Sequence, residues 1–280
     1  MDITIGMFCI PKMEDGFFAA DEQMRIFLNL VLPVVILLAV LVIWERTVHE
    51  LEIPHYILPP PSKIVVTLVT ERDQLLKHTL VTFQEMLYGF ALAISVGIPL
   101  AVLMFEFPVL EKAFYPYVIG SQTVPVFAIA PLLVLWFGFG IASKVVMAAI
   151  IVFFAIVLNT LDGLKSSDPD TVNLFRILRA SRWQILWKVR LPSALPFIFS
   201  GAKIGISIST IGAVIGEWIG SSAGLGFLML YANGKLQISL VFAAIFCLAF
   251  LGVGLFTLMT LLERLAMPWR QHQNKISDVR

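Results

Sequence analysis

Six long apolar stretches restrict what this chain of 280 residues can fold into. Each is 18 to 25 residues long, close to the roughly 20 apolar residues that a helix needs to cross the hydrocarbon core of a bilayer. With 59% hydrophobic residues, 14% charged residues and a mean hydropathy of +0.90, the composition is that of a membrane protein. The sequence therefore predicts an all-α polytopic membrane protein with six transmembrane helices, at Ile26–Trp44, Met86–Phe105, Tyr117–Phe139, Lys144–Leu161, Phe197–Ile219 and Ile238–Leu262.

The basic residues indicate which side of the membrane each connection faces. With both termini inside the cell, the inner segments hold thirteen Lys and Arg residues and the outer segments hold six. Positive charge near the ends of spans is retained on the cytoplasmic side. We therefore expect a multi-pass protein of the cytoplasmic membrane with both termini in the cytoplasm. The net charge of +1 is too small to suggest a nucleic-acid partner.

The connection from Asp162 to Pro192 is basic and polar between two almost uncharged spans. Asp168 followed by Pro169 is typical of a helix start, with an aspartate N-cap and a proline in the first turn. Ser181 with Gln184 three residues later predicts a capping box for a second short helix. A membrane protein that structures one cytoplasmic connection with two short helices is expected to dock a partner there.

The longest outer connection runs from Glu45 to Thr79 and contains four prolines. Pro54 and the run Pro59–Pro61 predict an extended first half. After them, Ser62 is expected to cap a helix from Lys63 to Arg72.

Proline and glycine are expected to interrupt several spans. Gly97 and Pro99 lie in the second window, and Pro125 and Pro131 lie in the third. In lipid the freed backbone groups must find partners, so such breaks belong on inward-facing surfaces. The fifth window carries a stripe of glycines, which indicates either close packing against another helix or a helix that shifts during gating: Gly201, Gly205, Gly212, Gly216 and Gly220.

Few polar side chains lie inside the spans, so each is a candidate for a translocation path or gate. Lys203 could line the path, or its long chain could reach back to the cytoplasmic interface. Glu217 could form part of an outer gate or sit at the interface, where we also expect Glu85. Asn159 and Ser209 could contact a substrate or bond to a neighbouring backbone carbonyl.

Cysteine and histidine give no sign of a metal site or a disulfide framework. Cys9 is predicted in the cytoplasmic tail and Cys247 inside a span, and the four histidines lack metal-ligand spacing. Met1–Gln23 is acidic and lacks the basic start of a signal peptide, so the first span is expected to stay as an anchor.

The central segment resembles the cytoplasmic signature of ABC importer permeases, whose pattern is EAA, three residues, Gly, nine residues, Ile, any residue and Leu-Pro. The matching positions are Asn173-Leu174-Phe175, Arg179, Val189, Leu191 and Pro192. The stretch RASRWQILWKVRLPSALP is similar to the nitrate, sulfonate and taurine type of these permeases, as are LPPPSKI, VPVFAIAPLLVLWFGFGIASK and GEWIGSSAGLGFLM. The resemblance covers about Leu58–Glu263. Asn173 replaces the family's Glu, bulky residues replace its alanines, and Arg179 replaces its Gly.

The resemblance implies the six-helix permease subunit of an ATP-driven importer, which makes and breaks no covalent bond. It implies a homodimer in the bilayer, an ABC ATPase subunit that binds ATP and Mg, and an external solute-binding protein. Residues 1–57 would hold the tail, first helix and start of the outer loop, 58–264 the permease domain and 265–280 the cytoplasmic tail. By position, the contact with the ATPase would fall on one set of residues: Asn173, Phe175, Arg179, Ala180, Ser181 and Arg182.

The resemblance also implies a small solute, such as a sulfonate, taurine, nitrate or the pyrimidine precursor of thiamine, with a weak preference for the last. Gly220–Asn233 would form a short outer re-entrant segment near the gate. No GxxxxGK[ST] phosphate loop is present in the sequence, which fits a separate ATPase. The alternatives are a secondary transporter, which would need coupling groups inside the membrane, and an intramembrane enzyme, which would need a catalytic set that the sequence does not show.

Overall fold

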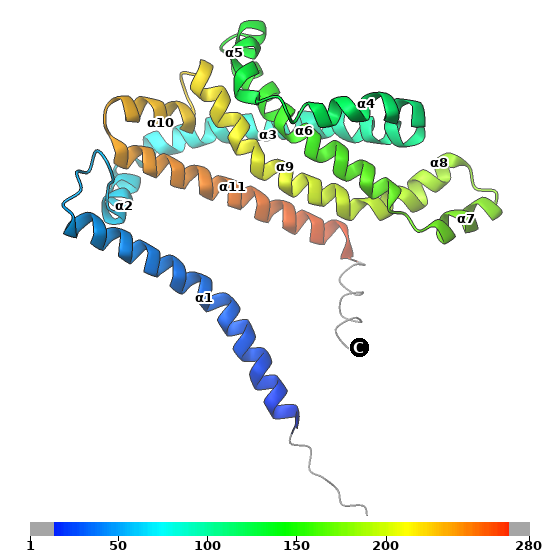
Figure 1. Cartoon of the computed structure of the whole chain (residues 1–280), viewed down its shortest axis with the longest axis horizontal. Helices are drawn as coiled ribbons and strands as arrows, with labels where there is room; N and C mark the ends of the chain where they lie inside the picture. The colour runs from blue at the N-terminus through cyan, green and yellow to red at the C-terminus, as the bar shows by residue number, and fades with distance from the viewer. Residues whose placement is uncertain (1–13, 269–280) are drawn as a thin grey trace, which may run out of the picture. The chain divides into compact units, whose positions relative to one another are not determined.

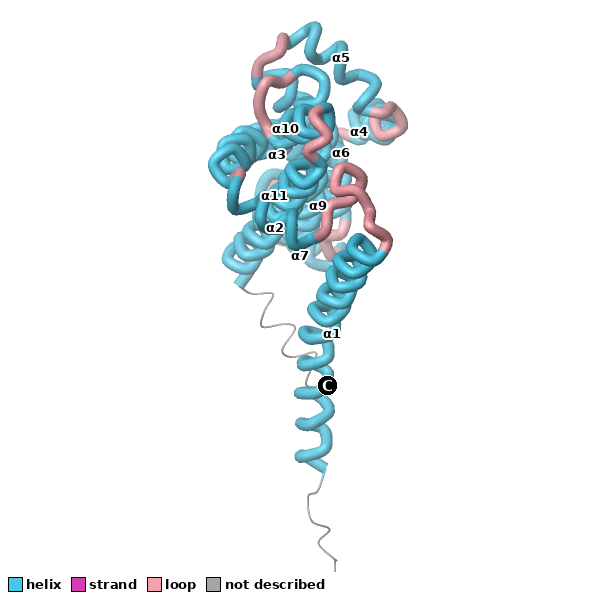
Figure 2. Tube along the Cα trace, turned by 90° about the vertical axis from the view of Figure 1, so that its left-hand side faces the viewer, coloured by secondary structure: helices cyan, strands magenta, loops and turns pink. Residues whose placement is uncertain are grey.

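A computed structural model describes the backbone of residues 14–268 and the side chains from residue 31 onward. These residues form helices joined by loops, without a strand in the described part (Figures 1 and 2). The chain divides between Lys63 and Ile64 into two compact units. Cys9, His272 and the basic residues Lys12, Arg270, Lys275 and Arg280 lie outside the described residues.

The first unit contains the long helix α1, Glu14–Glu50. Its stretch Val31–Glu50 is apolar enough to cross a membrane, and its apolar side chains between Leu32 and Ile43 are largely exposed. Exposed apolar side chains along this stretch are what contact with lipid requires.

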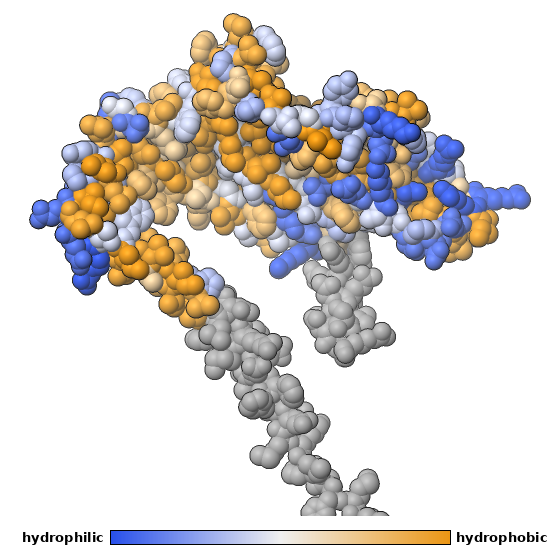
Figure 3. Space-filling model, viewed as in Figure 1, coloured by the Kyte–Doolittle hydropathy of each residue, from blue (hydrophilic) through white to orange (hydrophobic). Residues whose placement is uncertain are grey.

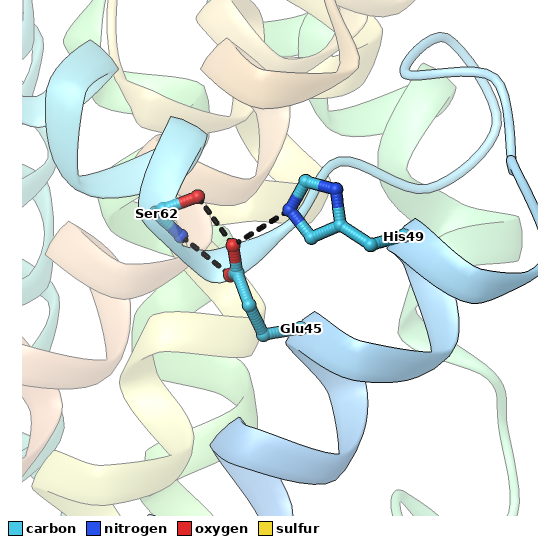
Figure 4. A network of polar contacts seen from close by, with 3 residues as sticks. All are labelled: Glu45, His49 and Ser62. Atoms are coloured by element: carbon cyan, nitrogen blue, oxygen red, sulfur yellow. Dashed lines mark hydrogen bonds and ion pairs between the residues drawn. The ribbon is translucent and has the colours of Figure 1, made fainter.

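A polar network joins the end of α1 to the start of α2, Pro61–Thr70 (Figure 4). The Glu45 carboxylate accepts hydrogen bonds from the Ser62 N–H at 3.0 Å and the Ser62 hydroxyl at 2.7 Å, and His49 lies 3.1 Å from the same carboxylate. The prediction that Ser62 caps a helix starting at Lys63 is therefore wrong. The helix begins at Pro61, because proline suits the first helical position, and Glu45 supplies the acceptor at its N-terminus.

The second unit is built on α3, Arg72–Glu106, α6, Ile141–Lys165, α9, Leu191–Gly220, and α11, Ile238–Ala266. α6 packs against both α3 and α9, while α11 packs on α9 and α3 (Figure 1). The apolar cluster at their centre includes Met86, Val152 and Ile206, each almost fully buried. The proline at position 99 and the glycines of the fifth window do not interrupt α3 or α9.

The third predicted span is broken. It forms α4, Pro108–Gly120, which packs on α3, and α5, Val126–Phe137, which packs on α6 and α9. A turn separates the two helices, and Pro125 at its end has no N–H with which to continue a helix. Within the described residues, five helices are long and apolar enough to cross a membrane by themselves. The prediction of one continuous helix in this window is wrong, because the window forms two shorter helices.

The glycine stripe of α9 lies against α6. A Cβ at Gly212 would come within 2.6 Å of the Cα of Ala148, and one at Gly201 within 2.7 Å of the Cβ of Asn159. These distances leave no room for a side chain, so the stripe packs the two helices closely, as the first of the two interpretations predicted.

Candidate functional site

The connection between α6 and α9 contains α7, Pro169–Ile177, which starts at the predicted cap. The Asp168 carboxylate accepts hydrogen bonds from the Thr171 hydroxyl at 2.6 Å and from the N–H groups of Thr171 and Asp170 at 3.0 and 3.2 Å. These bonds favour the charged form and lower the pKa of Asp168 below its ordinary value. The predicted aspartate cap is confirmed.

The second short helix, α8, spans Arg182–Ile185 and continues through a π-helical turn, Leu186–Arg190, into α9. The Ser181 N–H donates to the Gln184 side chain at 2.7 Å, and the Gln184 N–H donates to the Ser181 hydroxyl at 3.2 Å. This reciprocal pair is the predicted capping box.

The turn between α7 and α8 has a backbone that suits glycine at position 179. Arg179 occupies the glycine position of the signature and has φ +57°, in the left-handed region that favours glycine. The Ala180 N–H donates to the Phe175 carbonyl at 3.0 Å, the long hydrogen bond of a Schellman helix end. The turn keeps this geometry with an arginine, at a cost of about 1 kcal/mol of backbone strain.

A small apolar cluster holds α7 against α8 and the π-helical turn. Its buried members are Val172, Ile185 and Val189, and Phe175 and Ala180 pack on it. Phe175 and Ala180, predicted to contact a partner, are thus half-buried supports of the turn.

The exposed side of this connection combines polar and apolar side chains. Asn173, Arg179, Ser181 and Arg182 are exposed, as a contact role would require. The sequence interpretation missed three apolar residues that are exposed beside them, two in α7 and one at its C-terminal cap. Their spacing of i, i+3 and i+4 on a nine-residue helix was the available signal. We call these seven residues the α7–α8 face: Asn173, Leu174, Ile177, Leu178, Arg179, Ser181 and Arg182.

The predicted path residues are not brought together. The Asn159 amide donates to the Ala155 carbonyl at 2.8 Å, and the Ser209 hydroxyl donates to the Ile206 carbonyl at 2.7 Å, so both bond to their own helices. The Lys203 ammonium group lies 2.6 Å from the Glu263 carboxylate of α11 and forms an ion pair with it.

Glu217, by contrast, belongs to a buried polar cluster at the end of α9. Its side chain is only 1% exposed. The carboxylate accepts hydrogen bonds from the N–H groups of Gly226 and Phe227, in the first turn of α10, Leu225–Gly234. A carboxylate in this position satisfies donors that the helix itself cannot.

Two side chains of α3 complete the cap of α10. The Thr82 hydroxyl donates to Glu217 at 2.6 Å and accepts from the Leu225 N–H at 2.8 Å. His78 Nδ1 accepts from the Gly224 N–H at 2.9 Å. Four consecutive backbone donors at the start of α10 thus find acceptors on α3 and α9.

Glu85 and Lys144 extend this cluster. Glu85 is 2% exposed, and its carboxyl group contacts that of Glu217. Lys144 is 3% exposed, interacts electrostatically with both carboxyl groups, and donates to the carbonyls of Phe139 and Gly140 at 2.7 and 3.0 Å. The spacing of His78, Thr82 and Glu85 on one face of α3 was the signal that the sequence interpretation missed.

The α7–α8 face and the α10 cap lie at opposite ends of the second unit (Figure 1). Residues 93–267 match the family described as the binding-protein-dependent transport system inner membrane component. The chain belongs to this family. It is therefore the non-catalytic transmembrane permease of an importer for small solutes, a multi-pass helical protein of the inner membrane that works with an ATPase and a solute-binding protein.

Curated relatives and solved structures agree with the family. The permease is 40% identical to a probable ABC transporter permease protein of Haemophilus influenzae, over 82% of this chain and 94% of the relative. It is 38% identical to the formylaminopyrimidine transport permease protein of Halalkalibacterium halodurans, over 86% and 96%. Its fold is similar to that of a chain in an inward-facing structure of the MetNI methionine ABC transporter, with a TM-score of 0.61, 18% identity, and 70% and 97% covered.

Proposed function

We propose that the α7–α8 face docks the ATPase subunit and passes its movement to the spans. The observation that carries the proposal is a short, doubly capped pair of helices with its own apolar cluster, which presents exposed apolar and basic side chains. Such a turn can move as a rigid lever, because its geometry depends on contacts within itself. The π-helical turn and α9 follow α8 without a loop, so a push on the face is transmitted directly to α9.

This role requires the α7–α8 face to lie in the cytoplasm, with both termini on the same side. We further propose that residues 58–264 form the permease domain and that two copies of the chain enclose one translocation path. ATP binding by the partner subunits would then favour the outward-open arrangement, and hydrolysis would reset it. At the other end, the Glu217 cap would hold α10 in place as part of an outer gate.

Charge reversal on the face tests the docking proposal. Arg179→Glu combined with Arg182→Glu is expected to abolish copurification of the ATPase subunit while membrane insertion is unchanged. Lys188→Glu is the matched control, since Lys188 is exposed on the neighbouring turn but outside the face. Complex yield equal to that of the wild type in the double variant would contradict the docking role.

For the substrate, we propose a small solute of the pyrimidine-precursor type. The support is the relative whose name gives formylaminopyrimidine, together with the likeness of GEWIGSSAGLGFLM to such permeases. The test is uptake into vesicles by the permease with its own ATPase and binding protein, comparing formylaminopyrimidine with taurine at equal concentration. Uptake of taurine alone would contradict this substrate class and leave the docking proposal intact.

A further inference from the structure

A polar cavity of about 480 Å³ opens beside the α7–α8 face, between the end of α3 and the short helices. Three arginines and one glutamate line it, Arg176, Arg182, Arg190 and Glu106, beside the apolar side chains of Phe105 and Ile185. Arg182 is also part of the α7–α8 face. We call it the arginine pocket. The hydrophilic surface at this end of the second unit is visible in Figure 3.

Arg190 is held in place at this pocket. Its guanidinium lies 4.5 Å from the centre of the Phe105 ring and donates to the Leu164 carbonyl at 3.2 Å. Stacking on the ring and the hydrogen bond fix the orientation of the Arg190 guanidinium group. The pocket therefore presents at least one preformed donor group and does not need to order it on binding.

The charges in the pocket do not balance. Three arginines face one acid, and Arg176 lies close enough to Arg190 for their positive charges to repel each other. An anion between the guanidinium groups would replace that repulsion with attraction. A phosphate group fits the chemistry, because guanidinium groups bind its oxygens in pairs.

We propose that the arginine pocket binds a phosphate group, either as the headgroup of an anionic phospholipid or as a free phosphate. Two tryptophans on the same short segment, Trp183 and Trp187, are each 66% exposed and one turn apart. Exposed tryptophan is enriched where membrane meets water, which places the pocket at the depth of lipid phosphates. The proposal depends on the permease being in a membrane and not on ATPase docking.

The purified permease is to be titrated with phosphatidylglycerol and with phosphatidylcholine, and the bound lipids counted by native mass spectrometry. A second titration uses inorganic phosphate alone. The test variant is Arg176→Gln, because Arg176 is exposed and its 3.4 Å contact with Asn173 is weak, so the fold tolerates the change. Lys188→Gln removes the same charge outside the pocket.

We expect phosphatidylglycerol to bind in preference to phosphatidylcholine. Arg176→Gln should weaken the binding of phosphatidylglycerol about fivefold, which is the effect of losing one basic residue that faces anionic lipid. Lys188→Gln should leave binding unchanged. If inorganic phosphate alone binds with the same dependence on Arg176, the pocket holds the free anion, which also supports the proposal.

Three results would overturn it. One is equal binding of the two lipids together with no binding of phosphate. Another is an equal loss in both variants, which would mean that only net charge matters. The third is a loss of ATPase copurification in Arg176→Gln with lipid and phosphate binding unchanged, which would assign the pocket to the docking surface. Arg179 lies outside the pocket, so Arg179→Glu alone tests ATPase copurification without changing the pocket. A failure of docking can therefore be told apart from a failure of this proposal.

Discussion

The two ends of the second unit are built in different ways. At the α7–α8 turn, the decisive hydrogen bonds join residues three apart, as in Asp168 with Thr171 and Ser181 with Gln184. At the α10 cap, Thr82 and Glu217 are 135 residues apart, and His78 and Gly224 are 146 apart. The first end can keep its shape while it moves as a body, whereas the second changes whenever α3, α9 and α10 shift relative to one another. This difference suits a lever at one end and a gate at the other.

The largest effect is expected from Glu217→Ala. The change leaves the Gly226 and Phe227 donors buried without their acceptor, and it opens space beside Glu85. We expect a loss of about 3 kcal/mol in the free energy of unfolding in detergent, together with faster hydrogen exchange in α10. Glu217→Gln retains an acceptor and should lose less. A loss below about 1 kcal/mol in Glu217→Ala would show that the cap does not hold this end.

Thr82→Val tests the same end with almost no change in shape. It removes the hydroxyl that joins Glu217 to the Leu225 N–H, both of which are buried. An unsatisfied buried donor costs about 1–3 kcal/mol, so thermal unfolding should begin at a lower temperature. Thr257→Val is the control, because the exposed Thr257 hydroxyl bonds only to its own helix. Equal unfolding temperatures of Thr82→Val and Thr257→Val would contradict the long-range cap.

Arg179→Gly should stabilise the turn between α7 and α8, whereas the two changes above destabilise the α10 cap. Glycine adopts φ +57° without the strain that arginine carries, so the turn should be stabilised by about 1 kcal/mol. Slower amide exchange at Ala180 is the measurement. The matched control, Arg182→Gly, puts glycine at the first residue of α8 and should speed exchange there. Faster exchange in both variants would mean that the Arg179 side chain supports the turn.

The smallest effect is the pH dependence of the α7 cap. The hydrogen bonds to Asp168 lower its pKa in the folded protein, so the cap stabilises α7 above the ordinary carboxyl pKa of about 4. This stabilisation is lost as the pH falls through the lower pKa of the folded state. The exchange rate of the Thr171 amide relative to its intrinsic rate at the same pH should rise at acid pH, and Asp168→Asn should remove that rise. A relative rate that does not change with pH in the wild type would contradict the charged cap.

Features that depend on near neighbours in the chain were predicted from the sequence, whereas features that depend on distant residues were not. The caps at Asp168 and Ser181 were predictable because each needs only residues within one helical turn. The packing role of the α9 glycines was one of two interpretations, and the structure confirmed it. The third span was predicted as one helix and is two, since a hydropathy window does not register a break at Pro125. The same window does not register that Glu85 and Glu217 meet polar partners in other helices.

The sequence by itself determined the helical membrane class and the two capped helices of the connection. It also determined five of the predicted spans: the first lies in α1, and four others lie in the long helices of the second unit. All of these depend on apolar runs and on contacts between near neighbours in the chain. Only the tertiary structure decided which polar side chains meet inside the bundle. Those contacts join α3 to α9 and α10 across 135 and 143 residues and bring in Lys144 of α6. Burial without water makes each of them depend on its partners being in place.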